Sequence, residues 1–456
     1  MLTTTSAQQH QQRYQQTTSS TKADQDMSDQ APVSINGDEH DDRAFLCREA
    51  ILNRRQRVIG YEFMLHKGIT SRARVLTSAI GKFYDVALIA HLITIGIDRM
   101  LGKRSAFVAL FTLDSLHDPG IEQLPAKHIV LSIDIDKLRQ ANADQRQRIT
   151  DLHEAGFRIA CLFDGRIESN DHQHYALAQY LILDLSRPSD LDISHAINTI
   201  LSKCPHLEVL IKNILVHEEF SAVFSNSTYG QQVEYFQGPF VTSREPWEDK
   251  PVEANKLRII ELLNKVKQDE ALQTIAETLK RDPVLLFKIL RYVNSPLTGL
   301  RTHVETAEQA VLVLGRDKLY NWLSLLLFIT NQDTGDEFAL LDNALIRARM
   351  IELVGSRVLG PKHGSALFLT GIFSLLDVLL KLPLHRALGY LKLPESVVDA
   401  LLNEHGDYYP FLELALACET GTPKEVTAIA ERIGLTEDDV NEHHIDAIVW
   451  ANQLED

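Results

Sequence analysis

Apolar residues along this chain of 456 residues follow two different patterns. Between residues 43 and 243, short apolar runs alternate with longer segments that have helical spacing. From residue 128 onward the runs are continuous, which is typical of strands buried on both faces. The predicted strands are 45–51, 58–65, 106–110, 128–134, 157–163, 180–185, 207–211 and 235–240, and intervening helices are predicted at 78–101 and 140–154. This order predicts an α/β domain, a TIM-like (β/α)8 barrel that begins with a hairpin.

Beyond residue 251 the apolar spacing is helical throughout. Asp282 and Pro283 supply an N-cap and a proline at the first helical position. Thr306 and Gln309 have the spacing of a capping box, and the helix that they open is predicted to end at Gly315. The second part of the chain is therefore predicted to be all-α.

These patterns divide the chain into four segments. Residues 1–42 are rich in Gln, Ser, Thr and Asp and nearly lack large apolar groups, so we predict a disordered tail. It is either a solvated extension or a regulatory, partner-binding one. The barrel domain is predicted at 43–243, a linker with two prolines at 244–251, and the helical domain at 252–456. Apolar and charged contents of 45% and 24% suit globular domains.

Charge and cysteine usage restrict the partners and the compartment. A net charge of −16 argues against binding to nucleic-acid phosphates or anionic membranes. Four scattered cysteines form no CxxC pair, which indicates a reducing compartment. No signal peptide and no apolar stretch near the ~20 residues of a membrane helix is visible. We predict a cytoplasmic protein without membrane insertion.

Two stretches carry a resemblance to known families. The sequence FLCREAILNRRQRVIGYEFML, which ends at Leu65, resembles the opening hairpin of an EAL domain, the cyclic di-GMP phosphodiesterase barrel. The sequence RDPVLLFKILRYVNSPLTGLRTHVETAEQAVLVLGRDKLYNWLSLLLF resembles an HDOD domain, and FLTGIFSLLDVLLKLPLHRAL its later part. Residues 43–456 together resemble the EAL-HDOD class of bacterial signalling proteins. HDOD domains are similar to HD-class metal phosphohydrolases without the metal site, and no His-Asp pair occurs between Pro251 and Asp456.

The resemblance implies a set of site positions at the C-terminal ends of the barrel strands. An active EAL enzyme holds two Mg²⁺ or Mn²⁺ ions there with carboxylate and amide oxygens. Glu62 matches the signature Glu, and Asp184 and Gln237 match two further positions of the family. The other matching positions are substituted: His66, Leu110 (or Ala109), Ser132, Leu162, Phe163, Ile182, Lys212 and Leu215.

Two residues, Asp164 and Lys212, admit a further expectation. Asp164 could take an aspartate position only by a register shift, which would also turn side chains to the other face of the strand. Lys212 could place an ammonium group in the former metal pocket, where it would pair with Glu62 or Asp184.

The substitutions predict a chain that is not an enzyme and has no cofactor and no metal. The predicted function is a non-catalytic regulator that acts through protein partners of unidentified kind in a cyclic di-GMP-associated pathway, such as motility, biofilm or virulence control. The alternatives are a cyclic di-GMP receptor without hydrolysis and a weak cyclic di-GMP phosphodiesterase.

Other constellations are interpreted as structural. The polar groups at 171–174 and 443–444 are expected to be exposed rather than metal ligands, and no phosphate loop or dinucleotide fingerprint occurs. The apolar stripe from Leu319 to Leu327 is expected in the core of the helical domain, with an exposed docking face as the alternative.

Overall fold

The computed structural model describes residues 46–65, 78–187, 192–245, 247, 251–295, 303–329, 336–420 and 423–455. The predicted tail, 1–42, lies outside these residues, and so does part of the predicted linker. Residues 43–456 form one compact unit. The predicted boundary between a barrel domain and a helical domain inside this unit stays a prediction.

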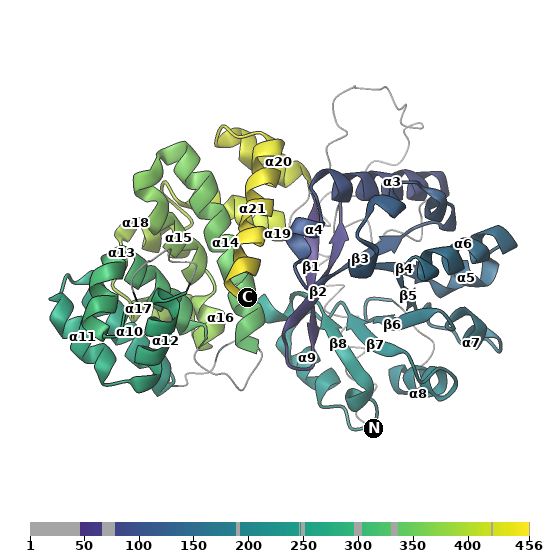
Figure 1. The fold of residues 1–456 in the computed structure, drawn as a ribbon, viewed down its shortest axis with the longest axis horizontal. Helices are drawn as coiled ribbons and strands as arrows, with labels where there is room; N and C mark the ends of the chain where they lie inside the picture. The colour runs from purple at the N-terminus through teal and green to yellow at the C-terminus, as the bar shows by residue number, and fades with distance from the viewer. Residues whose placement is uncertain are drawn as a thin grey trace, which may run out of the picture. The chain divides into compact units, whose positions relative to one another are not determined.

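Eight strands close into a barrel in sequence order. They are β1 (Cys47–Asn53), β2 (Val58–Met64), β3 (Ser105–Leu110), β4 (Ile129–Asp134), β5 (Arg158–Leu162), β6 (Ala178–Asp184), β7 (Glu208–Lys212) and β8 (Val233–Gln237). Strand β1 is antiparallel to both of its neighbours, β2 and β8, while β2 to β8 run parallel. The predicted barrel with an opening hairpin is confirmed (Figure 1).

The last strand is shorter than predicted. Strand β8 ends at Gln237, and 239–242 form a 3-10 turn, Pro239–Thr242. Between them Gly238 has a φ of 148°, and a Cβ at this position would lie 2.1 Å from the Ile214 carbonyl oxygen. Only glycine fits this close approach. The turn therefore stops the strand directly after Gln237.

Side chains that point into the barrel form a small core of their own. It consists of Ile51, Phe107, Val130, Ala160, Tyr180, Ile182 and Leu210. The Phe107 and Tyr180 rings meet edge to face with centroids 5.1 Å apart. Because these residues fill the interior, the barrel is packed rather than hollow, and polar chemistry is restricted to its ends.

Helices surround the barrel (Figure 1). They are α3 (Ser78–Thr94), α4 (Asp98–Leu101), α5 (Ile135–Gln140), α6 (Ala143–Glu154), α7 (Asp171–His174), α8 (Ile193–Lys203) and α9 (His217–Phe224). The single helix predicted at 78–101 is interrupted at Gly96, whose φ is 67°. The helix predicted from residue 140 starts only at Ala143, because Asn142 and Gln145 form a capping box there.

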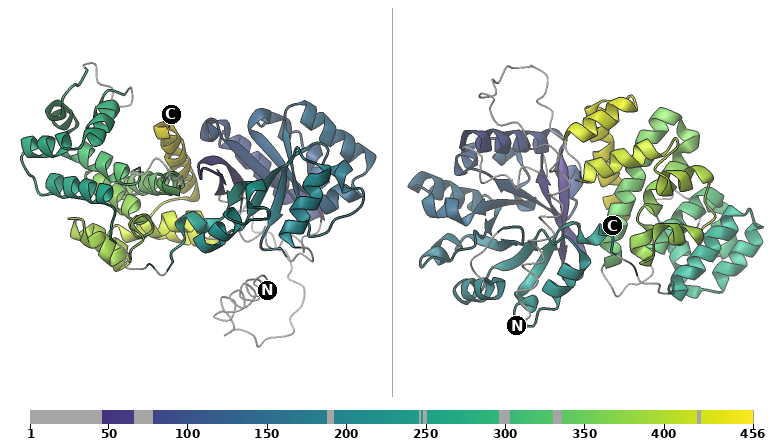
Figure 2. Two further views of the ribbon diagram at one scale, coloured as in Figure 1. Left: turned by 90° about the horizontal axis from the view of Figure 1, so that it is seen from below. Right: turned by 180° about the vertical axis from the view of Figure 1, so that it is seen from behind.

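The described residues from 254 to 455 contain helices and no strand, as predicted, and Figure 2 shows them in green to yellow. The α-helices are α10 (Ala254–Lys267), α11 (Leu272–Lys280), α12 (Pro283–Val293), α13 (Ala307–Leu327), α14 (Asp336–Leu359), α15 (Gly364–Phe373), α16 (Leu376–Leu380), α17 (Leu384–Gly389), α18 (Glu395–Leu402), α19 (Tyr409–Thr420), α20 (Pro423–Arg432) and α21 (Glu437–Glu455).

The predicted helix starts at Asp282 and Thr306 are confirmed, whereas the helix predicted to end at Gly315 continues to Leu327. The Asp282 carboxylate accepts the amides of Val284 and Leu285 at the start of α12. The Thr306 hydroxyl accepts the amide of Gln309, and Gly315 breaks helical geometry inside α13. The stripe Leu319, Trp322, Leu323, Leu326 and Leu327 is buried, so its interpretation as core is confirmed. Among the described helices, none combines the length and apolar character needed to cross a bilayer.

The outer face of β2 meets the helical region through a buried polar cluster. The Tyr61 hydroxyl donates to Asp342 of α14 at 2.9 Å and accepts from the Arg104 guanidinium at 2.7 Å. Arg104 also donates to Asn452 of α21 and lies 3.7 Å from the Asp342 carboxylate. We call these four residues the outer cluster. It ties a barrel strand to two helices that are about 280 to 390 residues further along the chain.

Candidate functional site

The candidate site lies at the end of the barrel where strands β2 to β8 finish, which we call the mouth. Side chains alternate between the two faces of a strand, so the residues in step with the inner core point into the barrel. By this alternation the inward positions nearest the mouth are Glu49, Glu62, Ala109, Ser132, Asp134, Leu162, Asp184, Lys212 and Gln237. Catalytic groups of (β/α)8 barrels sit at this end.

Glu62 is buried and fully engaged by protein groups. The Lys212 ammonium lies 2.8 Å from both of its carboxylate oxygens. The Gln237 amide donates to the same carboxylate and, at 3.0 Å, to that of Glu49, which faces Glu62 across the β1–β2 hairpin. The expected pairing of Lys212 with Glu62 is thus present.

Lys212 stays protonated despite its burial. Burial opposes its charged form, but the charges of Glu62 and Asp184, together with the hydrogen bonds to Glu62, outweigh that cost and raise the pKa of Lys212. An ammonium held among carboxylates at 7% exposure is a permanent positive charge at physiological pH.

Asp184 belongs to the same electrostatic group. Its burial favours the neutral acid, but the Lys212 charge and hydrogen bonds from Asn213 and Ser186 lower its pKa overall. Asn213 reaches it from a left-handed backbone conformation with a φ of 63°. Asp184 is therefore a charged carboxylate at the mouth.

A second cation, Arg187, completes the arrangement. Its guanidinium donates to both oxygens of Asp134 at 2.9 and 3.2 Å and lies 3.5 Å from Asp184. We call Glu49, Glu62, Asp134, Asp184, Arg187, Lys212 and Gln237 the mouth cluster. It combines four carboxylates, two cations and one amide.

The structure brings only some of the predicted site residues to the mouth. Ser132 and Leu162 point inward, whereas Ile182 lies deeper, in the inner core. Of the two candidates on β3, Leu110 packs in the large core outside the barrel, which we call the outer core. Ala109 is therefore the inward residue. Phe163 also packs in the outer core. Leu215 lies in the loop after β7 and is 43% exposed, and His66 lies outside the described residues.

Asp164 takes no part in the mouth cluster. It is held by the Arg139 guanidinium at 2.6 Å, and Arg139 also forms two hydrogen bonds with Asp171. Burial favours the neutral form of Asp164, but these hydrogen bonds lower its pKa overall. Asp171, expected to be exposed, is buried in this network, and His444 is buried as well. The expectation of exposure is wrong for Asp171 and His444, although His172 and Gln173 are exposed.

Sequence reasoning missed Glu49, Asp134 and Arg187. Glu49 carried a usable signal, because a short hairpin fixes its register opposite Glu62. Asp134 closes β4 two residues after Ser132 on the same face. Arg187 follows Asp184 in a turn, and nothing in its spacing indicates which carboxylate it meets.

The residues at the mouth do not fit a pair of divalent cations. Mg²⁺ and Ca²⁺ need several free oxygen ligands. Here both oxygens of Glu62 accept from Lys212, and both oxygens of Asp134 accept from Arg187. Within the part of the chain that the structure describes, no group of three or more His, Cys, Asp or Glu could hold a metal ion.

Comparisons with known proteins give a family match, two relatives and similar solved structures. The family model of the HDOD domain matches residues 252–374. The chain is 23% identical over 422 residues to YuxH of Bacillus subtilis (strain 168). The aligned region covers 91% of this chain and 99% of YuxH. It is 23% identical over 415 residues to the cyclic di-GMP phosphodiesterase CdgJ of Vibrio cholerae. That aligned region covers 90% of this chain and 93% of CdgJ. Among solved structures, the EAL domain of Xanthomonas citri FimX in complex with c-diGMP matches with a TM-score of 0.33 at 17% identity, over 45% of this chain and 89% of that one.

One prediction is wrong on this evidence, the expectation that the chain is not an enzyme. CdgJ is named a cyclic di-GMP phosphodiesterase, and its similarity extends over nine-tenths of this chain. The expectation gave the substitutions at single positions more weight than the resemblance that spans both halves of the chain. The matched HDOD domain at 252–374 behind a closed eight-stranded barrel confirms the resemblance to EAL-HDOD signalling proteins.

Proposed function

We propose that this chain acts in cyclic di-GMP signalling, that the mouth of its barrel takes up the nucleotide, and that it cleaves the nucleotide slowly. The observation that carries the proposal is the buried Lys212 ammonium beside Glu62 and Gln237. Lys212 and Arg187 offset two of the four carboxylate charges at this end of the barrel, and their ammonium and guanidinium groups suit the phosphate groups of a cyclic dinucleotide.

The similarity to CdgJ supports cleavage, and the lack of a fitting metal site at the mouth makes it slow. The similarity to CdgJ supports phosphodiester chemistry. Without a fitting pair of divalent cations, water activation and leaving-group stabilisation both weaken. The residues that remain can bind and orient a phosphodiester, and their carboxylates can accept a proton. We therefore place the activity far below that of an enzyme with a complete metal site.

Calorimetric titration of cyclic di-GMP into the full chain tests the binding. The expected result is saturable binding by wild type and clearly weaker binding by Lys212→Gln, which removes the positive charge. Lys280→Gln is the matched control, because Lys280 forms an ion pair with Glu308 far along the chain in the helical region. No detectable binding by wild type would remove the proposal.

Chromatographic detection of the linear dinucleotide tests the cleavage. Product should form slowly with wild type and disappear with Glu62→Gln, which keeps the side-chain shape and removes the charge. Equal product with both proteins would show that the mouth is not where cleavage occurs.

Two further statements stay predictions. Action through protein partners rests on the resemblance of the helical region to HDOD domains. A cytoplasmic location rests on the scattered cysteines.

A further inference from the structure

The mouth cluster has an unusual charge arrangement for a nucleotide site. It gathers four carboxylates and two cations within a few strand ends, and Lys212 itself is buried. A site that depends on divalent cations would leave carboxylate oxygens free to receive them. At this mouth most of those oxygens already have partners within the protein.

The engagement can be followed oxygen by oxygen. One oxygen of Asp184 accepts from the Ser186 amide, the Ser186 hydroxyl and the Asn213 amide, and the other lies 3.5 Å from Arg187. The Gln237 amide bridges Glu62 and Glu49. An incoming cation would have to displace these partners and lie close to two fixed positive charges.

Neither positive charge can easily move aside. Lys212 is buried at the end of β7, whose neighbours β6 and β8 pair with it on both sides. Arg187 is 18% exposed and contacts two carboxylates at once. Swinging Lys212 out would leave the buried Glu62 without a counter-charge, which is strongly destabilising, and swinging Arg187 out would do the same to the partly buried Asp134.

We propose that Lys212 and Arg187 are resident cations that take the place of divalent metal ions at the mouth, so that nucleotide uptake there is independent of metal. This inference rests on the proposed function for its ligand. It defines a site in which phosphate is met by an ammonium and a guanidinium, the two side-chain groups suited to charge-assisted hydrogen bonds with phosphate.

The first test is a titration of Mn²⁺ into the full chain, followed by calorimetry. Wild type should show no saturable binding. Lys212→Glu removes one cation and adds a carboxylate beside Glu62 and Asp184, so it should bind Mn²⁺ saturably where wild type does not. The gain should vanish when Glu62→Gln is added. Lys280→Glu makes the same change in an ion pair outside the mouth and should gain nothing.

Several results would overturn the inference. Saturable Mn²⁺ binding by wild type that is lost in Glu62→Gln would show a metal site at the mouth. A folded Lys212→Glu, by circular dichroism, that gains no Mn²⁺ affinity would show that Lys212 is not what excludes the metal. Should Lys212→Glu fail to fold, the wild-type titration still decides, and Lys212→Gln should show a smaller gain.

The second test separates this inference from the proposed function. Cyclic di-GMP is titrated into wild type in buffer with a chelator and in buffer with Mn²⁺. Equal affinities, within about twofold, support the inference, and binding only with Mn²⁺ overturns it. Absence of binding in both buffers contradicts the proposed function, while the Mn²⁺ titrations still decide whether the mouth excludes metal.

Discussion

Strand β2 separates two buried polar clusters that differ in origin and in consequence. Its inner face contributes Glu62 to the mouth cluster, whose members all come from the barrel. Its outer face contributes Tyr61 to the outer cluster, which includes Asp342 and Asn452 from the helical region. Neighbouring residues of one strand thus serve a candidate ligand site and a junction between barrel and helices.

The two clusters also differ in how their charges are balanced. At the mouth, charged groups meet charged groups: Lys212 contacts Glu62 at hydrogen-bond distance. In the outer cluster a neutral hydroxyl stands between Arg104 and Asp342, whose closest charged atoms are 3.7 Å apart. Burial and the nearby Asp342 carboxylate raise the pKa of Tyr61, so the hydroxyl stays neutral. We expect the mouth to depend on charge and the junction on hydrogen bonds.

The largest expected effect comes from removing the charge of Lys212. Lys212→Met leaves Glu62 and Asp184 buried without their ammonium, and loss of one partner of a buried ion pair costs roughly 3 to 5 kcal/mol of unfolding free energy. Urea unfolding of the full chain measures it. Lys280→Met, in an ion pair that is about half exposed, should change stability little. Equal losses from both variants would contradict a special role for the mouth charge.

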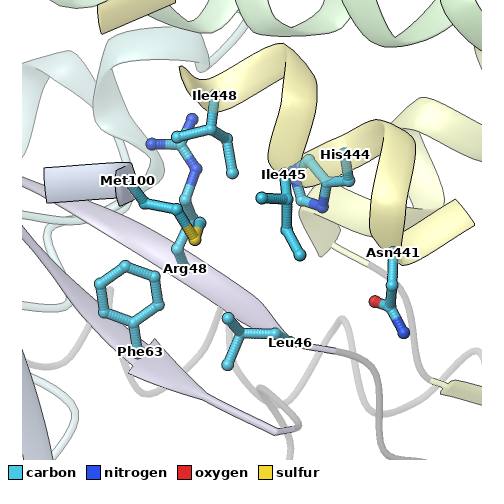
Figure 3. Close-up of a pocket in the computed structure, with 8 residues that line it drawn as sticks. All are labelled: Leu46, Arg48, Phe63, Met100, Asn441, His444, Ile445 and Ile448. Atoms are coloured by element: carbon cyan, nitrogen blue, oxygen red, sulfur yellow. The ribbon is translucent and has the colours of Figure 1, made fainter. Parts of the chain in front are cut away.

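A smaller effect, dependent on pH, is expected at the outer face of the hairpin. His444 of α21 lines a small cavity with Leu46, Arg48, Phe63 and Met100 (Figure 3). Burial, together with the charge of Arg48, lowers the pKa of His444 to about 3. The unfolded chain takes up this proton near pH 6.5 and the folded chain does not, so stability present above pH 6.5 is lost as the pH falls.

Between pH 6.5 and pH 5 this loss should be about 2 kcal/mol in wild type and should be reduced in His444→Leu. Urea unfolding at the two pH values measures it, with the exposed His385→Leu as the control. The lowered pKa of Asp184 keeps its own stabilisation intact until the pH falls below about 4, where the mouth should begin to weaken. A pH response of His444→Leu equal to that of wild type would contradict the assignment.

The smallest expected effect comes from the hydroxyl of Tyr61. Tyr61→Phe removes one hydrogen bond to Asp342 and one from Arg104, which should cost about 1 to 2 kcal/mol. Tyr320→Phe is the matched control, because the buried Tyr320 hydroxyl has no hydrogen-bond partner among the described residues. Its removal should be neutral or slightly stabilising. Equal effects of the two variants in urea unfolding would show that the outer cluster contributes no hydrogen-bond energy.

The contrast between the clusters also explains what could be predicted from the sequence. The barrel, the helical region, the cap at Asp282 and the pairing of Lys212 with Glu62 all follow from local patterns or from strand motifs. The end of β8 and the start of α6 were less predictable, because Gly238 and Asn142 act through backbone geometry and capping. The outer cluster could not be predicted, since it joins residues such as Tyr61 and Asp342 whose contact depends on how helices pack against the barrel.

Within the site, the limit of prediction was side-chain direction. The motif placed Leu110 and Phe163 at the mouth, but strand alternation turns both into the outer core. Arg187 was missed because its role depends on the three-dimensional proximity of Asp134 and Asp184, which lie on β4 and β6. A motif can thus indicate which residues belong to the site. The charged residues that pair with them can be identified only from the three-dimensional structure.

The central claim is that the Lys212 ammonium serves the mouth as a resident cation for nucleotide phosphate. Its most direct test is a calorimetric titration of cyclic di-GMP, in chelator, into wild type and into Lys212→Gln, which can still donate a hydrogen bond to Glu62. We predict metal-free binding by wild type and binding at least about tenfold weaker, or about 1.4 kcal/mol, by a folded Lys212→Gln. Equal affinity of the two proteins would contradict the account.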